Sequence, residues 1–94
     1  IKDLCFQNDI KFKVLIQPDL HDLSYDSNQF KCHLIIRKFL ENNRIRYVDL
    51  FDDFSENLKN EPEKIWVHPN DPHPNSFGHK IMYHRLMKDY ENLR

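Results

Sequence analysis

No apolar run in this sequence approaches the roughly 18 residues of a membrane-spanning helix, so the sequence predicts no membrane span. The formal net charge is only −1, which gives no electrostatic reason to expect nucleic acid or an anionic membrane as a partner. The two cysteines, Cys5 and Cys32, form no metal-ligand or redox motif, and we expect both to be free, buried thiols. Internal repeats and low-complexity linkers are also lacking.

The composition is that of one small globular domain. Its 94 residues are 39% hydrophobic and 31% charged, which favours a folded chain over a disordered one. Because the chain begins at Ile1 rather than at Met, we expect it to be the C-terminal piece of a larger protein.

Hydrophobic patterns predict strands alternating with helices. Because strand, helix, strand makes a βαβ unit, we expect two parallel strands with helices on their faces. Two parallel strands do not make a stable sheet alone, so a missing N-terminal segment or a second copy of the chain must cover them. The predicted elements are the end of a helix over 1–8, a strand over 12–16 buried on both faces, a helix over 28–42, a strand over 45–51, a short helix over 52–59, a Pro-rich loop over 60–76 with a brief extended piece at 65–67, and a helix over 76–93.

Two of the predicted helices carry an apolar stripe. Asp26 or Ser27 can cap the first of them, and Asn42 and Asn43 end it. We expect these stripes to face the core. Their members are Phe30, Leu34, Ile35, Phe39 and Leu40 in the first helix, and Phe77, Ile81, Leu86, Tyr90 and Leu93 in the last.

One histidine, His73, lies between two prolines on a short segment, Asp71-Pro72-His73-Pro74-Asn75. Proline fixes φ and removes a backbone donor, so this segment is stiff and cannot join a helix or a central strand. A stiff loop that carries a histidine and a nearby carboxylate suits a general base. It suits an ordinary helix-entry turn as well.

The segment from Ile65 to Ile81, with its His68-Pro69-Asn70, Asp71, His73-Pro74-Asn75 and Gly78-His79, resembles the C-terminal block of the SGNH (GDSL-type) hydrolases. That family contains esterases, lipases, acetylesterases and thioesterases that use a serine nucleophile, an aspartate and a histidine. The resemblance extends upstream to the Gln17-Pro18 strand end and the strand around Tyr47. It covers nearly all of this chain, but only the last third of a typical family member.

The resemblance implies a flavodoxin-like, three-layer α/β/α fold with a parallel sheet, of which residues 1–94 form the C-terminal part of a single domain. It implies that His73 is the general base for cleavage of an ester, that Asp71 orients it, and that no metal or organic cofactor is needed. The commoner family spacing puts the carboxylate three residues before the histidine, where this chain has Asn70.

The chain lacks the family's Gly-Asp-Ser tripeptide and has one glycine, Gly78. Nucleophile and oxyanion donors are therefore missing, and we expect the 94-residue chain alone to be inactive. A non-catalytic α/β association module, or an inactive hydrolase fragment, is the alternative.

Several other residues have two interpretations. Asn75 is expected to brace the loop or cap the last helix, and Gly78 to permit close packing. Trp66 either anchors the loop to the core or walls a pocket. His21 follows the end of a predicted strand and lies between two aspartates, so it is either a ligand-site residue or a solvated loop histidine. The spacing of the histidines from His68 to His84 does not match a zinc site.

Overall fold

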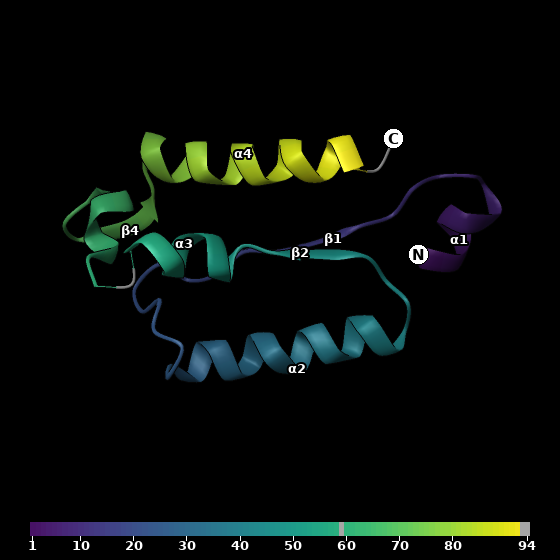
Figure 1. The fold of residues 1–94 in the computed structure, drawn as a ribbon, viewed down its shortest axis with the longest axis horizontal. Helices are drawn as coiled ribbons and strands as arrows, with labels where there is room; N and C mark the ends of the chain where they lie inside the picture. Colours follow the sequence, from purple (N-terminus) through teal and green to yellow (C-terminus); the bar gives the residue numbers. More distant parts are fainter. Residues whose placement is uncertain (59, 93–94) are drawn as a thin grey trace.

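Figure 1 shows the computed structural model of the chain, which describes residues 1–58 and 60–92. The predicted order of strand, helix, strand and helix is confirmed, with additional short elements before and between them. In chain order these are α1 (Lys2–Gln7), β1 (Val14–Ile16), α2 (Asn28–Asn42), β2 (Tyr47–Asp49), α3 (Phe51–Leu58), the 3-10 helix η1 (Pro62–Ile65), β3 (Trp66–His68), β4 (Asp71–Pro74) and α4 (Ser76–Asn92).

The strands β1 and β2 form the predicted parallel pair, and α2 is the connection between them. Ser27 caps α2, since its hydroxyl oxygen accepts from the backbone amide of Phe30 at 3.1 Å. Figure 1 shows α2 along one side of the strand pair and α4 along the other. The register places Val14 opposite Tyr47, Leu15 opposite Val48 and Ile16 opposite Asp49.

The predicted three-layer α/β/α fold with a flavodoxin-like parallel sheet is wrong for the part of the chain that the structure describes. Its strands form two separate two-stranded sheets, and no third strand extends the parallel pair. The remaining extended segments, β3 and β4, are separated by only two residues, so they pair antiparallel with each other. Pro72 and Pro74 cannot donate to a ladder, which confines β4 to an edge position.

The hydrophobic core lies at the carboxyl ends of β1 and β2, where the chain turns into the loop before α2 and into α3. Burial of a side chain such as Phe51 or Phe54, both fully buried, contributes about 1.5–3 kcal/mol. Phe30, Trp66, Ile81 and Met82 pack around its edge. The buried members are Leu20, Leu23, Val48, Leu50, Phe51, Phe54, Leu58 and Ile65.

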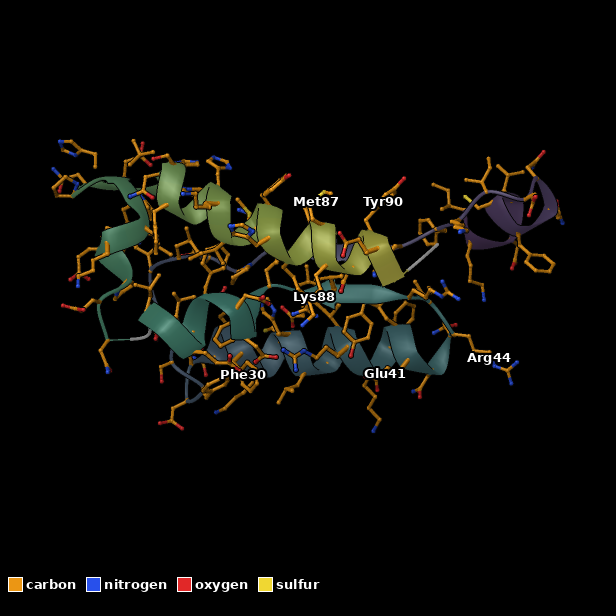
Figure 2. The ribbon with its side chains drawn as sticks, turned by 45° about the horizontal axis from the view of Figure 1, so that its top comes forward. Phe30, Glu41, Arg44, Met87, Lys88 and Tyr90 are labelled. Atoms are coloured by element: carbon orange, nitrogen blue, oxygen red, sulfur yellow. The ribbon has the colours of Figure 1, made fainter. Side chains whose placement is uncertain are left out.

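Burial along β1 and α4 differs from the prediction. Leu15 is 45% exposed, so β1 is not buried on both faces. In α4, Phe77, Leu86 and Tyr90 are exposed, while Ile81 packs against the core. Met87 and Tyr90, labelled in Figure 2, line an apolar hollow of about 340 Å³ against Val48. The predicted positions Lys59 and Leu93 lie outside the described residues.

The apolar stripe predicted for α2 faces the core only in part, through Phe30 and Leu40. Leu34, Ile35 and Phe39 are exposed, whereas the buried residues of the helix are His33 and Leu40. The cysteines are free, but Cys32 is exposed and Cys5 only half-buried, so the expectation of buried thiols is wrong. Polar residues occupy part of the inward face of α2 because they bind a buried carboxylate.

That carboxylate is Asp49, at the end of β2. His33 Nδ1 lies 2.9 Å from Asp49 Oδ1 and 3.0 Å from Oδ2, and Arg37 Nε donates to Oδ2 at 2.7 Å. Burial alone would raise the pKa of Asp49, but the Phe51 amide, Arg37 and His33 together lower it. The buried ionic cluster ties α2 to the strand pair.

Among the described residues, no helix combines the length and the apolar character that crossing a membrane requires.

Candidate active site

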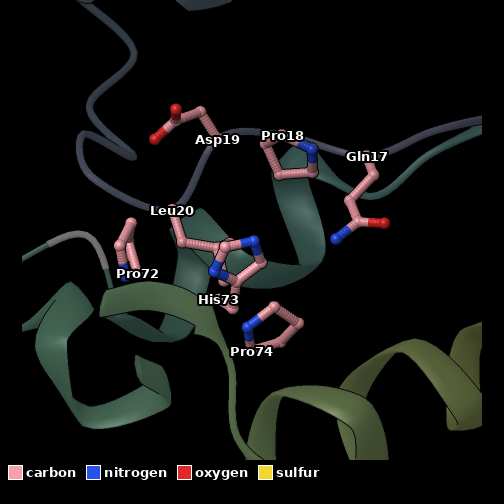
Figure 3. Close-up of a pocket in the computed structure, with 7 residues that line it drawn as sticks. All are labelled: Gln17, Pro18, Asp19, Leu20, Pro72, His73 and Pro74. Carbon is pink, nitrogen blue, oxygen red and sulfur yellow. The ribbon is translucent and has the colours of Figure 1, made fainter. Parts of the chain in front are cut away.

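The β3–β4 hairpin carries His73 to the carboxyl end of β1. Its turn is closed by His68 Nδ1, which accepts from the backbone amide of Asn70 at 3.1 Å. The hairpin then borders a hollow of about 230 Å³ with the residues that follow β1 (Figure 3). This hollow is lined by Gln17, Pro18, Asp19, Leu20, Pro72, His73 and Pro74.

Asp71 and His73 form a hydrogen-bonded pair. Asp71 Oδ1 accepts from the backbone amide of His73 at 3.1 Å and also contacts His73 Nδ1. The His73 imidazole, followed by the His73 backbone amide, lowers the pKa of Asp71. The His73 side chain is 83% exposed. With Nδ1 held by a carboxylate, Nε2 is the nitrogen left to receive a proton, which is the arrangement of a base and its orienting group.

The structure brings Asp71, rather than Asn70, to the imidazole. The backbone N–H of Asn70 donates to His68 Nδ1, on the other side of the turn. A spacing of two residues is sufficient because the Asp71 side chain reaches past Pro72 and accepts the backbone N–H of His73, which places the carboxylate beside the His73 ring.

Asn75 holds the hairpin against α4. Its Nδ2 donates to the carbonyl oxygens of Lys64 at 2.9 Å and Trp66 at 3.1 Å, and its Oδ1 accepts from the amide of Gly78 at 3.0 Å. The backbone amide of Asn75 donates to the Ile65 carbonyl at 2.8 Å. Bracing of the loop and capping of the helix, two alternatives in the sequence, are therefore both confirmed.

Gly78 and Trp66 fix the same hairpin from two sides. A Cβ added at Gly78 would lie 3.0 Å from Pro74 Cβ, so the predicted close packing is confirmed. Trp66 Nε1 donates to the Leu20 carbonyl at 2.9 Å, which anchors the hairpin to the segment after β1. The tryptophan is an anchor and is not among the residues that line the hollow at His73.

A second pair, Asp19 and His21, repeats the geometry of the first. Asp19 Oδ1 lies 2.8 Å from the backbone nitrogen of His21 and 2.6 Å from its Nδ1. The His21 backbone amide is the main reason that the pKa of Asp19 is lowered. Gln29 fixes this loop through the Asp19 backbone, from which its Oε1 accepts at 2.6 Å. Asp19 and His21 were not paired from the sequence, although their Asp-x-His spacing is the same as that of Asp71 and His73.

The buried pair of His33 and Asp49 was not predicted from the sequence. These residues lie 16 positions apart on different elements, so no local spacing reveals them. An aspartate at the end of an otherwise apolar strand is the only signal, since a buried carboxylate requires a partner.

None of the four serines of the chain lines the hollow at His73. Ser27 caps α2, and the Ser55 hydroxyl donates to the Leu23 carbonyl in the core. Ser24 Oγ accepts from the Asp26 amide, and Ser76 is the first residue of α4. The hollow therefore has an imidazole in contact with a carboxylate, without a serine hydroxyl among its lining residues.

The sequence matches no protein-family model and no curated protein, and no solved structure matches the fold. The likeness to the SGNH hydrolases therefore depends on the residues quoted for it, chiefly those between Ile65 and Ile81.

Proposed function

We propose that this chain provides the acid–base half of a serine-type ester hydrolase, as the C-terminal part of an SGNH-like enzyme. His73 is the general base, and Asp71 is its orienting residue. The observation that carries the proposal is the contact of Asp71 with His73 Nδ1, on a braced hairpin that leaves the imidazole exposed beside a hollow.

In the proposed reaction, His73 Nε2 takes the proton from a serine hydroxyl as its oxygen attacks the ester carbonyl. The same nitrogen then protonates the leaving alcohol. Asp71 stays ionised and stabilises the imidazolium, which agrees with the direction of its pKa shift. No metal ion or organic cofactor takes part.

The nucleophile and the oxyanion donors come from outside this chain in the proposed enzyme. A missing N-terminal part of the same hydrolase is the proposed source, with a second copy of the chain as the other candidate. The isolated 94-residue chain is therefore expected to be inactive.

The test is mutagenesis in the complete protein that contains this segment, assayed on acetyl and longer acyl esters. We expect His73→Ala to lower kcat by about 10⁴-fold or more, and Asp71→Asn by about 10²–10⁴-fold. His21→Ala is the matched control, because it removes an imidazole of the same geometry from a neighbouring loop. Unchanged turnover in His73→Ala would contradict the proposal.

A second candidate function is a non-catalytic association module. It is favoured by the absence of a serine from the His73 hollow and by the many exposed apolar residues of the described chain. A fluorophosphonate probe discriminates the two in the complete protein: covalent labelling of a serine that depends on His73 supports the enzyme, and no labelling supports the module.

A further inference from the structure

The outward face of α2 carries an exposed apolar stripe. Cys32, Ile35, Ile36 and Phe39 occupy positions i, i+3, i+4 and i+7, which lie on one side of a helix. Ile35 is 70% exposed and Phe39 61% exposed. Figure 1 shows α2 as the outermost element on its side of the molecule, with nothing beyond it.

The exposed stripe is not the side of α2 that packs against the rest of the chain. That inward side is already occupied, since Leu40 is buried and His33 and Arg37 bind Asp49. The helix is therefore apolar on the side away from the molecule. Stripes with this spacing are what amphipathic helices present to partners.

Two lysines border the stripe. Lys31 lies four residues before Ile35 and Lys38 three residues after it, so both flank the same face. Both lysines are exposed, and within residues 1–58 and 60–92 neither ammonium group has a carboxylate partner. The one acid on α2, Glu41 (Figure 2), accepts instead from the Tyr47 hydroxyl at 2.5 Å.

We propose that the outward face of α2 is a docking surface for an amphipathic helix that carries acidic residues beside its own apolar stripe. Ile35 and Phe39 are the anchors, and Lys31 and Lys38 set the charge preference. The proposal does not depend on the chemistry proposed for His73, which lies on a different element.

Charge selects this occupant over two others. In a two-fold contact between copies of α2 the same patch meets itself, so the lysines of one copy would approach those of the other without an acid between them. An anionic membrane would gain only two lysines from this face, and the chain as a whole has a net charge of −1. A carboxylate-bearing helix pairs both lysines while covering the stripe.

The test uses two synthetic amphipathic peptides of about three heptads with identical leucine stripes. One has glutamates beside the stripe and the other has lysines. Fluorescence anisotropy with the complete chain is expected to give at least tenfold tighter binding of the glutamate peptide, and the difference should shrink as salt is raised. The double variant Lys31→Glu/Lys38→Glu is expected to reverse the preference.

Ile35→Asp is expected to weaken binding of the glutamate peptide at least tenfold. Tyr83→Asp, at an exposed apolar position on α4, is the matched control and should leave binding unchanged, with circular dichroism confirming the fold of each variant. Equal binding of both peptides, or of neither, overturns the proposal. So does tighter binding to phosphatidylglycerol vesicles than to the peptide, or self-association that Ile35→Asp abolishes.

Discussion

Asp71 and His73 are held in contact by two bonds to one carboxylate oxygen, from the His73 backbone amide and from its ring nitrogen. The Asp71 carboxylate accepts from the peptide N–H of His73, which fixes where the imidazole can lie. The same arrangement recurs at Asp19 and His21. Local geometry of this kind follows from a spacing of two residues, which is why the first pair could be predicted from the sequence before any fold was known.

We expect the Asp71 carboxyl to titrate at a lower pH in the wild-type chain than in His73→Ala. The imidazole is the largest cause of its lowered pKa, and its removal leaves the residue-73 backbone amide and the more distant His68 as the lowering contributions. Carbon-detected NMR of the side-chain carboxyls between pH 2 and 7 measures both values. The Asp19 carboxyl is the internal control, because its own partner His21 is intact. An Asp71 pKa that does not rise in His73→Ala would show that the contact is not maintained in solution.

The residues that the sequence could not pair are His33 and Asp49. Their contact depends on where α2 lies over β2, and this tertiary contact decides which face of α2 turns inward. The apolar pattern of α2 predicted the opposite orientation for Leu34, Ile35 and Phe39. Bonds from His33 and Arg37 to a buried carboxylate outweigh that pattern, since an unpaired buried charge costs several kcal/mol.

Among the elements, α2 is the one whose bounds the sequence predicts best. Ser27 can satisfy the free amides of its first turn, and Asn43 follows its last residue, so both ends are encoded locally. For the β3–β4 hairpin, the sequence predicts only a brief extended piece at 65–67, which overlaps β3, within a Pro-rich loop. Its strands are three and four residues long, and the prolines of β4 hide the pattern by which a strand is recognised.

The hairpin and α4 are expected to depend on Asn75. Asn75→Ala removes the cap of α4 together with two bonds to the carbonyls of Lys64 and Trp66. A lost cap costs about 1 kcal/mol and each unmade bond a further ~1, so we expect about 2–3 kcal/mol of destabilisation. Urea denaturation measures it. Asn70→Ala, in the exposed turn of the same hairpin, is the control and should stay within about 0.5 kcal/mol of wild type.

Packing of α2 on the strand pair is expected to weaken in acid. The folded-state pKa of Asp49 is lowered, so its ionic contacts stabilise the fold fully above the ordinary carboxyl value of about 4. This contribution is lost as the pH falls through the lowered, folded-state value. Urea midpoints between pH 2 and 7 should show a fall below pH ~4 that is smaller in Asp49→Asn. An identical acid slope in both proteins would contradict the assignment.

For the molecule as a whole, the main departure from expectation is the small sheet. The sequence predicts the parallel pairing of β1 and β2 correctly. An apolar strand, a capped helix and a second apolar strand make a βαβ unit, in which the two strands are parallel and the connection is almost always right-handed. It cannot predict how many strands a sheet contains beyond those that the chain supplies. The three-layer fold is what the family resemblance implies, whereas the described residues include only one parallel pair.

The free edge of that pair is expected to bind another strand. Val14 donates to the Arg46 carbonyl at 2.9 Å and Ile16 accepts from Leu50 at 2.9 Å, so the intervening Leu15 points its peptide groups away from β2. The Leu15 side chain is also 45% exposed. An apolar edge with free backbone groups favours pairing with a second chain.

Sedimentation equilibrium of the isolated chain is therefore expected to show a dimer or larger species. An added segment that pairs with the free edge of β1 is expected to give instead a complex that contains one copy of the chain. Leu15→Lys should reduce the association constant at least tenfold, because a lysine on an edge strand opposes pairing by charge and hydration. Ile35→Asp is the matched control: it also places a charge at an exposed apolar position, but on the outward face of α2, and should leave this association unchanged. A monomer with one sharp cooperative melting transition would mean that the two-stranded pair is sufficient by itself.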